Sequence, residues 1–143
     1  HNREAVSSLL GQTRADVGLV IQGGCGQAFR GSGHPHVFFD SDDDLADFAA
    51  VGAIGLNPVT QGGGTNLKLL HYLAHGMRVV SSEFGMRGYE GLKDFVQVTS
   101  PLEVIGALQN PLPDPPFRPE LEHQYGWSRL ASRLEQRYRG LIT

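Results

Sequence analysis

The segment LNPVTQGGGTNLKLLHYLAHGMRVVSS, which runs from Leu56 to Ser82, holds three consecutive glycines between an expected strand and an expected helix. Glycine gives up more backbone freedom on folding than any other residue, so it weakens any regular element that it enters. Pro58 marks the end of the strand, and Gly76 is expected to close a helix over residues 66–75. The triplet therefore indicates a loop where the backbone must turn sharply or approach another molecule closely.

Short apolar runs alternate with amphipathic runs on both sides of this segment. The apolar runs predict buried strands over residues 17–24, 36–40, 53–59, 77–82 and 95–100. Helical spacing predicts further helices over residues 2–12, over 41–52 with Ser41 or Asp42 as N-cap, and over 101–108 with Pro101 first. Residues 26–35 are expected to form a glycine-rich loop. The alternation predicts an α/β fold built on a doubly wound parallel sheet.

The two ends of the chain carry amphipathic helices. At the start, Ala5, Val6, Leu9 and Leu10 share one helical face. Near the other end, residues 110–119 form a proline-rich connector, and closing helices are expected over 120–143. The apolar positions of the last helix are expected to pack on the sheet or on neighbouring helices: Trp127, Leu130, Leu134 and Tyr138. Its arginine row is expected to face solvent.

Length and composition bound the classes of function. A chain of 143 residues suits one domain with its own core. A net charge of -3 gives no general attraction to nucleic acid or to anionic membranes. No apolar run approaches the roughly 20 residues that a membrane span needs. Cys25 is the only cysteine, so an internal disulfide is excluded and a reducing compartment fits; we expect it to be an ordinary loop residue.

The glycine loop is a candidate anion site. In open parallel sheets, ligands bind outside the carboxyl ends of the strands, where a loop leads into a helix. The first N–H groups of a helix lack partners within the helix and attract anions. Lys68 falls in the first turn, where its charge opposes the helix dipole unless an anion joins it. A phosphorylated ligand would account for all three features, whereas a tight turn with no ligand would account for the glycines alone.

The residues from Pro58 to Gly88 also match a known pattern. The block Gly64-Thr65-Asn66-Leu67-Lys68, with its flanking residues, resembles the nucleotide-sugar-binding segment of retaining glycosyltransferases of the GT-B fold, group 1 type. The matching positions that flank the block are Pro58, Gly62, Leu70, Tyr72, Ala74, Gly76, Val79, Val80, Ser81, Gly85 and Gly88. The order of elements before and after agrees with this family, so the resemblance covers nearly the whole chain.

The resemblance implies a fold and an activity. Residues 1–143 would form the C-terminal donor-binding domain of a longer enzyme, a Rossmann-like three-layer α/β/α half of a GT-B architecture. The first strand of that domain, with the loop that supplies a basic diphosphate-binding residue, and an N-terminal acceptor domain would lie upstream of residue 1, so this chain alone would be inactive. The donor-binding residues would be Gly62, Gly63, Gly64, Thr65, Asn66, Lys68 and His71.

The implied reaction moves a sugar, with retention, from a nucleoside diphosphate sugar such as a UDP- or GDP-sugar to an unknown acceptor. No metal or other cofactor is expected, and no catalytic residue is assigned in this domain. The implied setting is polysaccharide biosynthesis in the cytoplasm, with at most peripheral contact at the inner face of a membrane. The expected partners are the donor and the N-terminal domain of the same chain, without nucleic acid.

Two departures from the family keep other functions open. Gly63 and His71 stand where many relatives carry two glutamates, the second of which, or an aspartate there, commonly binds the ribose hydroxyls. These changes motivate a degenerate domain that binds a nucleotide or a partner protein without transferring sugar; a sugar-nucleotide epimerase is a further alternative. A metal site at His34 and His36 lacks an evident third ligand, and the acids Asp42 to Asp44 suit the start of a helix better than a cation site.

Overall fold

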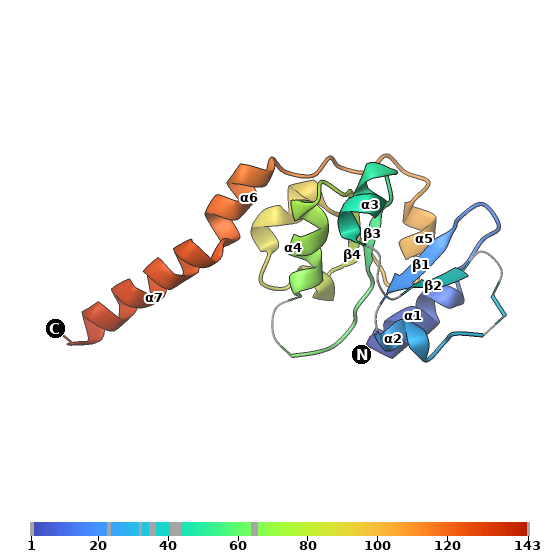
Figure 1. Ribbon diagram of the computed structural model, residues 1–143, viewed down its shortest axis with the longest axis horizontal. Coiled ribbons are helices and arrows are strands. Elements are labelled where there is room, and N and C mark those ends of the chain that lie inside the picture. The colour runs from blue at the N-terminus through green and yellow to red at the C-terminus, as the bar shows by residue number, and fades with distance from the viewer. Residues whose placement is uncertain are drawn as a thin grey trace.

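The computed structural model describes residues 2–22, 24–31, 33–34, 37–40, 44–63 and 66–142. Its helices are α1 (Asn2–Leu10), α2 (Gly24–Gln27), α3 (Leu45–Ala50), α4 (Leu67–Ala74), α5 (Val104–Ala107), α6 (Arg118–Tyr125) and α7 (Trp127–Ile142) (Figure 1). Its strands are β1 (Leu19–Gln22), β2 (Val37–Asp40), β3 (Gly55–Asn57), β4 (Val79–Ser82) and β5 (Gln97–Thr99). Two 3-10 turns, η1 (Phe84–Met86) and η2 (Glu90–Phe95), separate β4 from β5.

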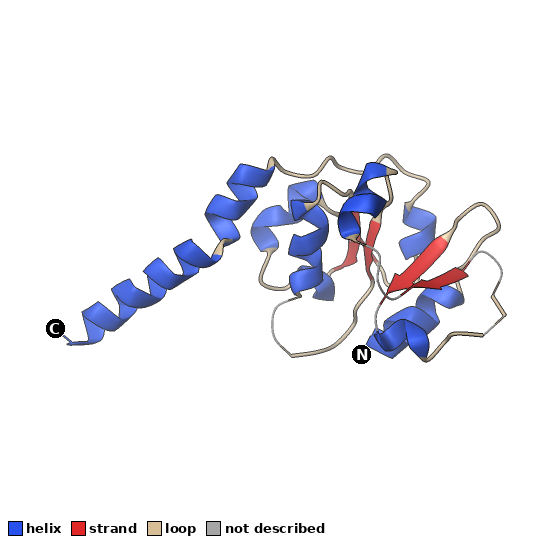
Figure 2. Ribbon diagram, in the orientation of Figure 1, coloured by secondary structure: helices blue, strands red, loops and turns tan. Residues whose placement is uncertain are grey.

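The strands pair in parallel, as the alternation of strands and helices predicted. β1 pairs with β2 in the register Leu19 to Val37, and β4 lies between β3 and β5 in the order β3-β4-β5. The chain is therefore an α/β protein with parallel strands, shown in red in Figure 2. The expectation of a single sheet is not met within the described residues, because β1-β2 and β3-β4-β5 form two separate groups.

Helices cover both faces of β4. Val79 and Val80 are fully buried neighbours that point to opposite faces, as successive residues of a strand must. Val80 joins a core with residues of α1, β1 and α5. Val79 joins a second core with Leu69 and Leu73 of α4 and with Leu121 of α6. The predicted face of the first helix is confirmed, because α1 buries Ala5, Val6, Leu9 and Leu10.

The helix α4 approaches β3 unusually closely. A Cβ atom at Gly55 would lie 2.5 Å from Cγ of Tyr72, so no side chain fits beneath that ring. At the other end, Gly76 adopts a φ of +74°, the left-handed conformation that commonly follows a helix. The expected helix after the glycine loop is thus confirmed, with Asn66 as its N-cap and His75 as its C-cap.

Three local expectations need correction. The N-cap of α3 is Asp44, whose side chain accepts a hydrogen bond of 3.1 Å from the N–H of Ala46; Ser41 and Asp42 lie outside the described residues. The helix α5 begins at Val104, and Pro101 lies in the preceding turn, where its carbonyl accepts a bond from Gln12. The short helix α2 occupies the start of the expected glycine-rich loop.

The expected packing of the last helix is wrong where it can be checked. Trp127 is 82% exposed and Leu130 is 39% exposed, whereas the side chains of Leu134 and Tyr138 lie outside the described residues. The extended connector carries the chain across the domain to α6, and α7 then projects away from the other elements (Figure 1). Of the helices in the described residues, none is both long and apolar enough to span a membrane.

A leucine in α4 and a leucine in α7 should respond differently to substitution by alanine, because the first is buried and the second is exposed. Leu73→Ala should lower the free energy of unfolding by about 2–5 kcal/mol, because it empties a fully buried site. Leu130→Ala is the matched control and should change it by less than about 0.5 kcal/mol, as at other surface sites. Urea denaturation of both variants measures the difference. Equal losses would mean that α7 packs on this domain in solution.

Candidate functional site

The site expected from the glycine loop lies where β3 and β4 end. β3 ends at Asn57 and continues through residues 58–66 into α4, whereas β4 ends at Ser82 and continues into η1. Because the two strands are parallel neighbours, both loops leave the same edge of the sheet. This carboxyl edge is where ligands of open parallel sheets bind.

A buried amide joins the elements at this edge. Asn57 is 1% exposed. Its Nδ2 donates to Oγ of Ser81 at 3.1 Å and to the carbonyl of Gly85 at 3.3 Å, and its Oδ1 accepts from Nδ2 of Asn66 at 2.6 Å. One side chain therefore holds together β3, β4, the start of η1 and the start of α4.

Ser82 forms a second set of bonds between the same two loops. Its hydroxyl donates to the carbonyl of Val59 and accepts a bond of 3.0 Å from the N–H of Gly85. Every buried side-chain polar atom in the described part of the chain has a hydrogen-bond partner. Unsatisfied polar groups cost about 1–3 kcal/mol each when buried, so this complete network favours one arrangement of the two loops.

The glycine loop is held from outside by an arginine. Gly62 adopts a φ of +143°, which residues with a side chain rarely adopt, and its carbonyl accepts a bond of 2.9 Å from Nη2 of Arg87. The guanidinium carbon of Arg87 lies 4.3 Å from the ring centre of Phe84, a cation–π contact. At Gly63 a Cβ would meet nothing within 4 Å. Gly64 and Thr65 lie outside the described residues.

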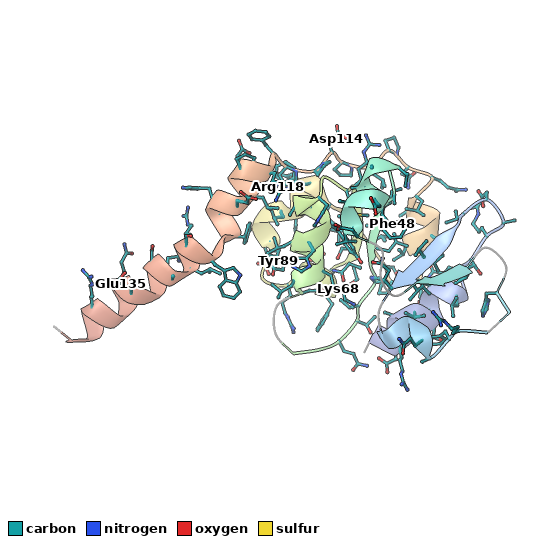
Figure 3. All side chains as sticks on the ribbon, in the orientation of Figure 1. Phe48, Lys68, Tyr89, Asp114, Arg118 and Glu135 are labelled. Carbon is teal, nitrogen blue, oxygen red and sulfur yellow. The ribbon has the colours of Figure 1, made fainter. Side chains whose placement is uncertain are left out.

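A cavity of about 470 Å³ opens beside this edge. Its body lies between β1 and β3, and Lys68, His71 and Tyr72 of α4 also line it. Lys68 and His71 are exposed, and Figure 3 shows Lys68 at the end of α4 that follows the glycine loop. The cavity thus has an apolar body and a polar, basic border beside the loop.

Pairing of charges distinguishes the two lysines of the chain. Nζ of Lys93 lies 2.7 Å from Oε1 of Glu83, and this hydrogen bond raises the pKa of the lysine ammonium. The N–H of Gly88 donates to the carboxylate of Glu90 and lowers the pKa of that carboxyl. Lys93 therefore has an acidic partner after β4, whereas Lys68 is the lysine that lines the cavity.

The structure brings together part of the expected site. Lys68 and His71 are three residues apart on α4 and line the same cavity, as their spacing predicted. Asn66 instead directs its side chain to Asn57, so it positions the loop. Sequence reasoning missed the contributions of Asn57 and Arg87; a polar residue that ends a buried apolar strand was the available signal for Asn57.

The structure adds no support for a metal site at His34 and His36 or for a cation site at Asp42 to Asp44. His34 is exposed, and His36, Asp42 and Asp43 lie outside the described residues. Among the residues that are described, no group of three or more histidine, cysteine, aspartate or glutamate side chains could hold a metal ion.

Comparison with known proteins finds no matching family model, no matching curated protein and no matching solved structure. The function of this chain is therefore inferred from its own residues: the glycine loop, the buried hydrogen-bond network of Asn57 and Ser82, and the basic border of the cavity.

Two glycines at this edge should respond differently to alanine. A Cβ at Gly85 would lie 2.5 Å from both Nδ2 of Asn57 and Oγ of Ser81, so Gly85→Ala should destabilise the protein by about 1–3 kcal/mol through overpacking. Gly63→Ala has open space and should change stability by less than about 0.5 kcal/mol. Thermal unfolding of the two variants measures both effects. If Gly85→Ala left the stability unchanged, the hydrogen-bond network of Asn57 and Ser81 would be able to shift and accommodate a methyl group.

Proposed function

We propose that this chain is the donor-binding half of a retaining glycosyltransferase of the GT-B fold. In this proposal residues 1–143 form a Rossmann-like C-terminal domain with three α/β/α layers, and a nucleoside diphosphate sugar binds at the carboxyl edge of β3 and β4. One observation carries the proposal: Lys68 and His71 line the same cavity directly after a glycine loop. The parallel strands and the resemblance of the loop to this family support it.

The diphosphate is assigned to the loop and the first turn of α4. The N–H groups that open a helix attract anions. Lys68 is exposed in that turn, where its charge opposes the helix dipole. A bound phosphate accepts hydrogen bonds from these backbone N–H groups. It also pairs with the ammonium of Lys68 and so offsets the unfavourable interaction of that charge with the dipole. Gly62 and Gly63 leave the approach to these groups without side chains.

The ribose is assigned to His71, one turn further along α4. A residue three positions after Lys68 lies on the same helical face. A nucleoside diphosphate that places its phosphates at Lys68 extends its ribose along this face, toward His71. A neutral imidazole offers one acceptor nitrogen, whereas a carboxylate can accept from both ribose hydroxyls. His71 would therefore hold the ribose with fewer bonds than a glutamate at the same position.

The chemistry required of this domain is stabilisation of a leaving group. When the bond between the sugar and the diphosphate breaks, negative charge develops on the departing diphosphate. Fixed backbone N–H groups and the charge of Lys68 stabilise that charge without reorganising during the reaction. Arg87 supports this role indirectly, because its bond to the carbonyl of Gly62 holds the loop in place before the donor arrives. The acceptor would come from the N-terminal domain, across a cleft, and the enzyme would act in the cytoplasm.

The residues Gly63 and His71 favour one alternative, a domain that binds the nucleotide without transferring sugar. Calorimetric titration of the full-length protein with UDP, GDP and the matching nucleosides tests the shared binding step. Release of nucleoside diphosphate from UDP- and GDP-sugars, with and without candidate acceptors, then tests transfer. Binding with turnover supports the transferase, binding without turnover supports the alternative, and sugar isomerisation without acceptor would indicate an epimerase. Absence of nucleotide binding would overturn all three.

Lys68→Ala in the full-length protein should weaken the nucleoside diphosphate more than the nucleoside. Losing one charge-assisted hydrogen bond to phosphate should cost about 1.5–3 kcal/mol of binding free energy, and the nucleoside makes no such bond. Lys93→Ala is the matched control, because this lysine pairs with Glu83. Calorimetry with both ligands measures the difference. Equal weakening of both ligands by Lys68→Ala would leave the lysine a packing role alone.

His71→Glu should tighten donor binding in the full-length protein. The new carboxylate adds one acceptor for the ribose, so the gain should be about 1 kcal/mol, the worth of a typical hydrogen bond. The gain should vanish for a 2′,3′-dideoxyribose analogue, which lacks both hydroxyls. His71→Ala serves as the comparison at the same position. If both substitutions leave the affinity for UDP and GDP unchanged, His71 does not face the ribose.

A further inference from the structure

The helix α7 exposes the start of an apolar face. Trp127 is 82% exposed and Leu130 is 39% exposed, although both are large apolar side chains. The helix follows α6 and runs away from the other elements of the domain (Figure 1). Single exposed apolar residues are common on protein surfaces, whereas apolar neighbours on one face mark a surface that binds something.

The sequence of α7 separates apolar from polar residues completely. At 3.6 residues per turn, its apolar positions fall within one sector about 120° wide, and no polar position falls inside that sector. These apolar positions are Trp127, Leu130, Ala131, Leu134, Tyr138, Leu141 and Ile142. The pattern is therefore that of a helix with one broad apolar face.

The structure turns the polar side of α7 toward α6. A groove of about 680 Å³ between the two helices is lined on the side of α7 by polar residues only: Ser128, Arg129, Ser132, Arg133 and Gln136. The joint between the helices is tight, because a Cβ at Gly126 would collide with the carbonyl of Glu122. The apolar sector lies opposite this groove and so points away from α6.

The polar positions of α7 are basic. They hold Arg129, Arg133, Arg137 and Arg139 with a single acid, Glu135, which lies 2.6 Å from Nη2 of Arg139. Four arginines and one glutamate give α7 a net charge of +3; since the whole chain carries -3, the remainder carries -6. The basic charge is therefore concentrated in the helix that also exposes Trp127.

An anionic lipid surface fits this helix better than a second copy of the chain. Helices that lie in a membrane interface combine a broad apolar side, often with Trp, and an arginine-rich polar side. By contrast, the 16 residues of α7 span little more than two heptads, whereas a coiled-coil pattern is sustained over at least about three. Two copies packed through this face would also bring their basic rows together.

The distribution of charge orients the chain on such a surface. The attraction of an anionic leaflet for basic residues falls off within a Debye length of about 8–10 Å. Because α7 projects away from the domain (Figure 1), its arginines can enter this layer while most of the acidic remainder stays outside it. Long arginine side chains can also lie along the apolar surface with their charged ends at the headgroups.

We propose that α7 is an interfacial helix that lies flat on an anionic lipid surface. Trp127 and Leu130 enter the boundary between headgroups and acyl chains, and the arginines contact the anionic headgroups. This contact is peripheral, because no helix in the described part of the chain is long and apolar enough to span a membrane. The proposal does not depend on what binds at the carboxyl edge of the sheet.

Flotation of the full-length protein with lipid vesicles tests the proposal. At low salt, partitioning onto vesicles of phosphatidylcholine with phosphatidylglycerol should be at least about tenfold stronger than onto phosphatidylcholine alone. Raising the salt concentration should remove this difference, because it screens the charges. Trp127→Ala should weaken partitioning onto the anionic vesicles at least about tenfold, and Arg133→Gln about fivefold.

Two variants outside α7 serve as matched controls. Leu102→Ala shortens another large apolar side chain, which is 75% exposed, and Arg3→Gln removes an exposed arginine of α1. Both should leave partitioning within about twofold of the unchanged protein, because neither residue belongs to the proposed surface. Thermal unfolding of every variant checks that the protein remains folded.

Four outcomes overturn the proposal. The first is no flotation with the anionic vesicles, and the second is flotation that Trp127→Ala leaves unchanged. The third is a dimer that Trp127→Ala dissociates in sedimentation velocity, which would assign the face to a second copy. The fourth is a clear loss of stability in Trp127→Ala, which would show that another part of the same chain covers the face. Failure of nucleotide binding in the titration leaves each of these outcomes unaffected.

Discussion

The arrangement of the carboxyl edge depends on the buried amide of Asn57. It donates to Ser81 and Gly85 and accepts from Asn66, so it links two strands and the helix that follows the glycine loop. Leaving a buried amide without one of its hydrogen-bond partners lowers the free energy of unfolding by about 1–3 kcal/mol, which is a large part of the stability of a typical domain. This constraint leaves no room for a side chain at position 85, and it ties the N-cap of α4 to the end of β3. The position of Lys68 follows from that starting point.

The strands and most helices could be predicted because their sequence patterns are local. Apolar runs marked the five strands, and Gly76 marked the end of α4. The cap of α3 could not be predicted, because Ser41 and Asp42 have the same capping chemistry as Asp44. The exposure of α7 could not be predicted either. Helical spacing shows that Trp127 and Leu130 share a face, but it carries no information about what covers that face.

The candidate site, like the fold, could be predicted only where it depends on local sequence patterns. Lys68 and His71 were predicted to share a cavity because both lie on one helix, where a spacing of three fixes their relative direction. The partners of Asn57 and the bond from Arg87 to Gly62 join residues 9 to 28 positions apart in sequence. Such contacts depend on how the strands and loops pack together. The sequence therefore predicted that Lys68 and His71 face the same space, but not the hydrogen-bond network beside them.

The cavity connects the folding of this chain to its proposed activity. Its body separates β1 from β3, and Lys68 and His71 line the same space. The two strands belong to separate groups, so a ligand that contacted both sides of the cavity would bridge them. By mass action, such a ligand would stabilise the form of the protein in which the two groups of strands hold a fixed relative position. Packing of the two groups of strands and binding of the proposed anionic ligand should therefore reinforce each other.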